Sequence, residues 1–205
     1  ELEHISKSYG NKVIINDFSC RIMRGDRIGL LGPNGVGKST LLKLILNKLN
    51  PDAGKVRLGT KLSVAYFDQM REQLNEEATL IETISQGSDF IEIGKVWKHV
   101  ISYLEDFLFA PQRSRSPVKT LSGGERNRLL LARLFSRPAN VLVLDEPTND
   151  LDIETLELLE ALLQDYEGTL FLVSHDRSFL DNVVTQVIAF EGEGVLQEYM
   201  GGYED

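Results

Sequence analysis

The chain has 205 residues, of which 42% are hydrophobic and 26% are charged, an ordinary composition for a soluble globular protein. This length supports one sizeable core but not two full domains, and no apolar run is long enough to cross a bilayer, which argues against insertion into a membrane. The net charge of −9 argues against broad electrostatic attraction to nucleic acid or to an anionic membrane surface.

The single cysteine, Cys20, excludes a disulfide framework, and no secretory signal opens the chain. We therefore expect a cytoplasmic protein. Because the sequence begins at Glu1 rather than at a methionine and stops abruptly at Asp205, we also expect it to be a piece of a longer chain.

The first part of the chain predicts strands, a glycine-rich turn and a helix. Residues 1–25 and 55–67 show the alternation typical of strands and are expected to form a small antiparallel sheet. The apolar run 27–31 predicts a buried parallel strand, because it is short and followed at once by polar residues. An apolar helical pattern then covers 41–49.

The rest of the chain predicts an insertion and a return to alternating strands and helices. Residues 79–109 are expected to form mostly short helices, within an inserted helical subdomain at about 70–137. The apolar runs 141–144 and 169–173 predict two more buried strands, and Asp152 can cap the helix between them.

The expected fold class is therefore α/β. It has a mainly parallel sheet, a small antiparallel β-subdomain and the inserted helical subdomain. We expect one domain over 1–205, with the β-subdomain and core at about 1–69 and 138–205.

The segment Gly32-Pro-Asn-Gly-Val-Gly-Lys-Ser39 matches the phosphate-binding pattern G-x-x-x-x-G-K-[ST], directly after a predicted strand and before a predicted helix. Its glycines let backbone N–H groups turn toward phosphates, Lys38 can reach the β- and γ-phosphates, and Ser39 can bind Mg²⁺. A chance match in a chain of this length is on the order of 1%, so a mere glycine-rich turn is the weaker interpretation.

Two carboxylates end the apolar run that begins at Val141. Unpaired charges at such a place are costly without a cation to meet them. Asp145 is the expected Mg²⁺ partner, and Glu146 the expected general base or water-orienting group for attack on the γ-phosphate. An exposed acidic strand end would be the simpler interpretation of these residues alone, but not beside a phosphate-binding loop.

A second anion-binding helix start is predicted at Leu121-Ser-Gly-Gly-Glu125. Ser122 can cap the helix, and the two glycines leave N–H groups free to face an anion. Alone this would be an ordinary turn. Because the chain already has one helix start for phosphates, a second one most simply serves a different nucleotide, held by a partner.

Leu-Ser-Gly-Gly-Glu between the phosphate-binding loop and the acidic strand end resembles the signature of the ATP-binding cassette (ABC) superfamily. The resemblance implies a P-loop NTPase core of the ABC ATPase type that binds ATP with Mg²⁺ and hydrolyses it. It also implies two cassettes packed head to tail, where each site combines the loop of one cassette with the signature of the other. ATP would join them and hydrolysis would release them.

The resemblance assigns further roles. Tyr9 would stack on adenine, Gln69 would sense Mg²⁺ and the attacking water, His175 would contact the γ-phosphate, and Asp152 would communicate across the pair. Each also has a structural interpretation: a packed edge tyrosine, a loop amide, a structural histidine and a helix cap.

The full set of expected site residues follows from these assignments. The catalytic residues are Glu146, His175, Lys38 and Gln69. The nucleotide contacts are Tyr9, Gly32, Pro33, Asn34, Gly35, Val36, Gly37, Lys38, Ser39 and Thr40. The contacts to the partner's nucleotide are Ser122, Gly123, Gly124, Glu125 and Asp152. The metal ligands are Ser39, Gln69 and Asp145.

Two details resemble the ABC-F branch, whose members carry two cassettes in one soluble chain without a membrane domain. Glu125 replaces the glutamine usual in transporters, and Asp152 ends the run Glu-Pro-Thr-Asn-Asp-Leu-Asp. The chain looks closest to the second cassette of a bacterial member. For the longer protein this implies a second cassette as partner, action on the ribosome or translation, and a DNA-linked role through a C-terminal region that this chain does not contain.

Two other functions stay open at this stage: an ATPase subunit of a membrane transporter, and a nucleotide-gated clamp with negligible turnover. The isolated chain is expected to be mainly monomeric and slow. The range 112–137 has one acidic residue and seven basic ones, so it could face phosphates of RNA or be a solvated face with local ion pairs. These basic residues are Arg113, Arg115, Lys119, Arg126, Arg128, Arg133 and Arg137.

Overall fold

The computed structural model describes residues 1–68 and 72–201, and their fold divides into two compact units. The first unit contains Glu1–Tyr66, Asn140–Pro147 and the chain from Glu167 onward, and the second contains Phe67–Ala139 and Thr148–Tyr166. Gln69, expected to be a catalytic residue and a metal ligand, lies outside the described residues.

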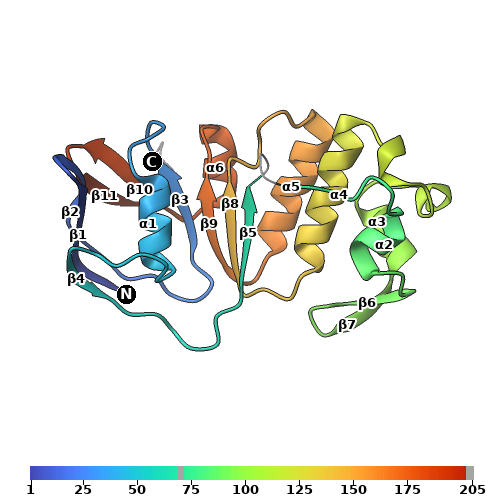
Figure 1. Ribbon diagram of the computed structural model, residues 1–205, viewed down its shortest axis with the longest axis horizontal. Helices are drawn as coiled ribbons and strands as arrows, with labels where there is room; N and C mark the ends of the chain where they lie inside the picture. Colours follow the sequence, from blue (N-terminus) through green and yellow to red (C-terminus); the bar gives the residue numbers. More distant parts are fainter. Residues whose placement is uncertain (69–71, 202–205) are drawn as a thin grey trace. The chain divides into compact units, whose positions relative to one another are not determined.

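The first unit is built around a six-stranded sheet, whose strand order is β11-β10-β3-β9-β8-β5 (Figure 1). Neighbours from β10 to β8 are parallel, whereas β10 and β11 form an antiparallel hairpin. The prediction of a mainly parallel sheet is therefore confirmed. The strands are β3 (Arg27–Leu31), β5 (Val64–Asp68), β8 (Val141–Asp145), β9 (Thr169–Val173), β10 (Gln186–Gly192) and β11 (Val195–Met200).

Helices cover both faces of this sheet, which explains why its central strands β3, β8 and β9 are mostly apolar and buried. On one face, Leu41 and Leu44 of α1 (Lys38–Ile45) belong to the same buried core as Val143. On the other face, Gly29 of β3 lies so close to α6 (Arg177–Val183) that an added Cβ would come within 3.1 Å of a Leu180 methyl carbon. Cys20 is also in the core, and its burial raises the pKa of the thiol to about 12.

A three-stranded antiparallel sheet of order β2-β1-β4 completes the first unit. Its strands are β1 (Leu2–Tyr9), β2 (Lys12–Cys20) and β4 (Ala53–Val56). The expectation that 55–67 belongs wholly to this sheet was wrong, because Val64–Asp68 forms β5 of the larger sheet. Alternation identifies a strand but not the sheet that it joins.

The second unit is mainly helical, with α4 and α5 side by side (Figure 1). Its helices are α2 (Leu80–Ser85), α3 (Val100–Asp106), α4 (Gly123–Ser136), α5 (Ile153–Asp165) and two 3₁₀ turns at Pro111–Arg113 and Val118–Thr120. The expectation of mostly short helices over 79–109 was wrong in part. A hairpin of β6 (Phe90–Ile93) and β7 (Val96–His99) lies between α2 and α3.

The described helices are all too short or too polar to span a lipid bilayer.

Candidate functional site

The turn between β3 and α1 forms a cradle of backbone groups. Gly37 has a φ of +122°, and a Cβ there would lie 2.3 Å from a methyl carbon of Ile14, so this position requires glycine. α1 begins at Lys38 without a side-chain cap. The first N–H groups of α1 are therefore available to an anion placed at this end.

Lys38 is buried in this cradle, and its ammonium group donates a hydrogen bond to the Gly32 carbonyl oxygen at 2.6 Å. Burial lowers the pKa of Lys38, while the nearby carboxylates of Glu146 and Asp145 act in the opposite direction. The side chain is thus a partly desolvated cation that points back along the loop, and a bound phosphate would strengthen its charged form.

A pocket of about 340 Å³ opens over this cradle, a volume within the usual range of small-molecule sites. Nine of the expected residues line it: Tyr9, Asn34, Gly35, Gly37, Lys38, Ser39, Thr40, Asp145 and Glu146. Lys12, Ile14 and Val173 also line it, and the sequence did not indicate them. Gly32, Pro33, Val36 and His175 do not form its lining.

Lys12 and Tyr9 enter the pocket as cross-strand partners of β2 and β1. The Lys12 ammonium donates to the Gly35 carbonyl oxygen at 3.0 Å. Tyr9 is 51% exposed, and the Lys7 ammonium lies 5.6 Å from the centroid of its ring. Tyr9 is therefore a half-open aromatic surface at the pocket and not a packed edge residue.

The two carboxylates at the end of β8 have different surroundings. Asp145 accepts a hydrogen bond from the Tyr66 hydroxyl at 3.0 Å. Glu146 has a φ of +49°, a strained value for a residue other than glycine, and its N–H donates to the Val173 carbonyl oxygen at 2.8 Å. The Glu146 side chain is only 18% exposed.

His175 brings three segments of the chain together. Its Nε2 lies 3.0 Å from Asn34 Oδ1 and 3.0 Å from Glu146 Oε1, but only the contact with Asn34 has hydrogen-bond geometry. The His175 N–H donates to Glu146 Oε2 at 3.3 Å. Oε1 of Glu146 is buried and accepts no hydrogen bond from the described residues, so it is available to a molecule in the pocket.

The signature residues start α4 in the second unit. Ser122 Oγ accepts from the Glu125 N–H at 3.2 Å, and Glu125 Oε1 accepts from the Ser122 N–H at 3.0 Å, which makes a complete capping box. The hydrogen bond from the Ser122 N–H is the main cause that lowers the pKa of Glu125, and Arg113 adds to it from 3.0 Å.

Asp152 lies against the signature. It caps α5 by accepting from the Thr155 N–H at 2.8 Å, as expected of a helix cap. A Cβ added at Gly124 would come within 2.9 Å of Asp152 Oδ2, so the two segments are in close contact. An open pocket of about 850 Å³ adjoins these two segments, and Gly123 and Gly124 are among the residues that line it.

The basic range 112–137 is largely engaged in ion pairs within the second unit. Five of its seven basic residues pair with carboxylates: Arg113 with Glu125, Lys119 with Glu77, Arg126 with Glu76, Arg128 with Asp152 and Arg133 with Glu72. Arg115 and Arg137 are exposed and form no ion pair with a described residue. Local ion pairing, and not a free phosphate-binding patch, is thus the main feature of this range.

A family of protein domains described as "ABC transporter" matches residues 15–149. The chain is 56% identical over 205 residues to the ATP-binding protein Uup of Haemophilus influenzae, a match that covers all of this chain and 32% of that protein. It is 40% identical over 205 residues to the energy-dependent translational throttle protein EttA of Escherichia coli, again over all of this chain and 37% of that protein. The resemblance to ABC-F proteins is confirmed by these relatives.

A solved structure of an archaeal ribosome recycling factor, aABCE1, in complex with the ribosomal stalk protein aP1 matches the fold. The TM-score is 0.73 at 28% identity, and the match covers 99% of this chain and 40% of that one. The chain therefore spans about a third of the length of the curated relatives described above, which are larger proteins.

Proposed function

The chain belongs to the ABC family of ATP-binding cassettes, and from that premise we propose that it binds ATP with Mg²⁺ and hydrolyses it at a site shared with a second cassette. The observation that carries the proposal is the convergence of Lys38, Asp145 and Glu146 on one pocket over the cradle of α1. Residues 1–205 would form one cassette, with a helical subdomain at about 70–137.

The residues at the cradle suit a nucleotide with its metal. No three His, Cys, Asp or Glu side chains cluster as a metal site within 1–68 and 72–201. Mg²⁺ is usually held by one or two protein oxygens together with substrate phosphates and water. Ser39 and Asp145 would hold the ion, with Gln69 as a proposed third ligand. Mg²⁺ would supply charge neutralisation at the phosphates.

The protein groups would act on the γ-phosphate and on the water that attacks it. Lys38 and the N–H groups of the loop bind the phosphates and balance the charge that develops as the water attacks in line. Glu146, whose buried Oε1 accepts no hydrogen bond from the described residues, orients the water and accepts its proton. His175 holds Glu146 through its backbone N–H and would contact the γ-phosphate when ATP is bound. Tyr9 stacks on the adenine ring.

The signature would serve the nucleotide of the partner cassette. The capping box satisfies Ser122 and Glu125 but leaves the N–H groups of Gly123 and Gly124 for an anion. Asp152 lies beside Gly124 and would link this contact to the opposite cassette. ATP would close the two cassettes head to tail, and hydrolysis would release them.

For the longer cytoplasmic protein we propose action on the ribosome. The supporting observations are the names of relatives, a translational throttle protein and a ribosome recycling factor. The names of these relatives do not mention DNA, transport or a clamp with negligible turnover.

The test is cosedimentation of the two-cassette protein with ribosomes, with Glu146→Gln and its counterpart in the other cassette to keep ATP unhydrolysed. Binding that requires ATP supports the proposal. The added change Lys38→Ala, which removes a phosphate contact, should abolish this binding as the control. A protein that binds ATP but sediments apart from ribosomes would refute the ribosomal role while leaving the ATPase assignment intact.

A further inference from the structure

The outer face of the β6–β7 hairpin is exposed and aromatic, and the proposed ATPase chemistry does not use it. In the antiparallel register Phe90 lies opposite His99, and Glu92 lies opposite Trp97. Opposite residues share a face of a two-stranded sheet, so these four side chains lie on one face. Phe90 and Trp97 are 53% and 67% exposed, whereas Ile91 on the other face is buried.

Neighbouring contacts hold this face in shape. The Phe90 and His99 rings meet edge to face, with their centroids 5.1 Å apart. His99 Nδ1 accepts the Ile101 N–H at 3.1 Å and so caps α3, which fixes the imidazole ring. Exposed and preorganised aromatic surface of this kind marks an interaction site, because it offers contact area with little loss of side-chain freedom.

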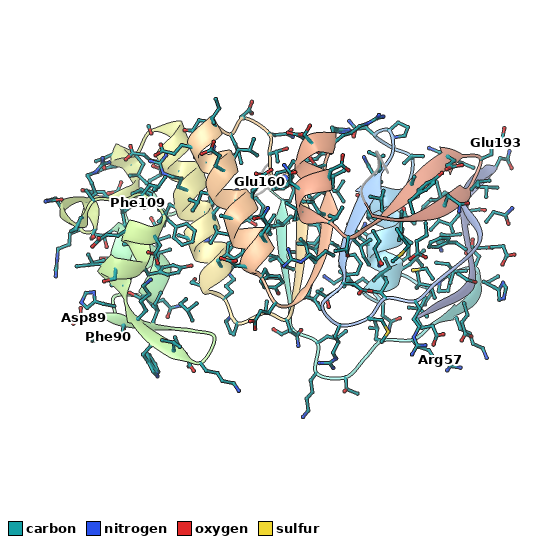
Figure 2. The ribbon with its side chains drawn as sticks, turned by 180° about the vertical axis from the view of Figure 1, so that it is seen from behind. Arg57, Asp89, Phe90, Phe109, Glu160 and Glu193 are labelled. Atoms are coloured by element: carbon teal, nitrogen blue, oxygen red, sulfur yellow. The ribbon has the colours of Figure 1, made fainter. Side chains whose placement is uncertain are left out.

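The charges around the rings are mostly negative. Asp89 and Glu92 are exposed, and neither forms an ion pair with a described residue; Figure 2 places Asp89 next to Phe90 at the start of the hairpin. Of the two lysines in the hairpin, Lys98 is paired with Asp106, which leaves Lys95 at the turn. Aromatic rings beside carboxylates favour arginine and lysine side chains and disfavour the phosphates of nucleic acids.

We propose that this face, made of Phe90, Glu92, Trp97 and His99, docks a basic segment of a partner protein. Arginine or lysine side chains of that segment stack on Trp97 and Phe90, and Glu92 and Asp89 pair with their charges. The interaction is separate from the nucleotide chemistry and does not rest on it.

Trp97 is the only tryptophan of the chain, so its fluorescence reports directly on the proposed face. The 205-residue chain is titrated with a short peptide that alternates arginine and leucine, with a matched peptide in which glutamate replaces arginine, and with a short single-stranded RNA. We expect a saturable change of emission with the arginine peptide alone.

Substitutions distinguish binding at this face from general electrostatic attraction of a basic peptide to an acidic protein. Phe90→Ala and Glu92→Lys should each weaken binding of the arginine peptide about tenfold. Glu193→Lys changes the net charge equally, in the turn between β10 and β11, and should alter the affinity less than about twofold. Equal weakening by Glu193→Lys, saturable binding of the RNA instead, or an emission unchanged by the arginine peptide would each overturn the proposal.

Discussion

At the scale of single residues, Lys38 is the side chain on which phosphate binding should depend most. Lys38 is buried, and its ammonium group donates a hydrogen bond to a carbonyl oxygen of its own loop. A hydrogen bond between a charged group and a phosphate contributes about 1.5–3 kcal/mol. Lys38→Ala should therefore weaken ATP binding about 10- to 100-fold, measured by titration calorimetry.

The matched control for this change is Lys43→Ala, which removes an exposed lysine from the last turn of the same helix. It should leave the ATP affinity unchanged. Equal weakening by both changes would mean that Lys38 acts only through the net charge or through the stability of α1.

The loop and strand-end residues that line the pocket could be predicted from the sequence, because each lies within a short local pattern. The hydrogen-bond partners of these residues could not be predicted. Tyr66 meets Asp145 across 79 positions, and His175 meets Asn34 across 141. No local periodicity encodes such contacts, which depend on the order of strands in the sheet. Local ion pairs were one of the two interpretations open for the basic range, but their partner carboxylates could not be named for the same reason, since Arg133 and Glu72 are 61 positions apart.

At the scale of elements, a comparison of the two capping boxes distinguishes an effect on stability from an effect on activity. Thr79 starts α2 and Ser122 starts α4 with the same reciprocal hydrogen bonds. Ser122→Ala and Thr79→Ala should each destabilise the fold by about 1 kcal/mol, which thermal unfolding can measure. Only Ser122→Ala should also lower ATP turnover at chain concentrations where cassettes pair. Equal loss of turnover in the two variants would contradict a role for the signature in hydrolysis.

The capping box of α4 also predicts a pH dependence. The folded state lowers the pKa of Glu125 below its ordinary value of 4.5, so the unfolded chain takes up this proton first as the pH falls. The stabilisation is therefore present above about pH 4.5 and is lost as the pH decreases through the lower folded value. Glu125→Gln should make the difference between the thermal unfolding midpoints at pH 7 and at pH 4 smaller than in the unmodified chain. An unchanged difference would show that Glu125 contributes nothing to acid unfolding.

Elements were predictable where apolar residues follow one another without interruption by several polar ones. The runs 27–31, 141–144 and 169–173 are mostly apolar and were recognised as strands of the parallel sheet. The strands β6 and β7 have four residues each, too few for alternation to compete with helical patterns on either side. The glycine between them, Gly94, has a φ of +64° and is the one local signal of the turn.

At the scale of the whole molecule, each proposed catalytic site is divided between two cassettes. Such a chain should be mainly monomeric and slow when dilute, and its turnover per molecule should rise with concentration. Lys38→Ala removes the phosphate-binding half. Gly123→Asp adds a negative charge at the signature, where a new Cβ meets no atom within 4 Å, so the fold should tolerate it.

The most direct test mixes these two variants at a concentration where the unmodified chain hydrolyses ATP. We predict that each variant alone is inactive and that the equal mixture recovers about a quarter of the unmodified rate, because half of the pairs are mixed and each mixed pair has one complete site. Turnover by Gly123→Asp alone at the unmodified rate would contradict a catalytic site shared between two cassettes.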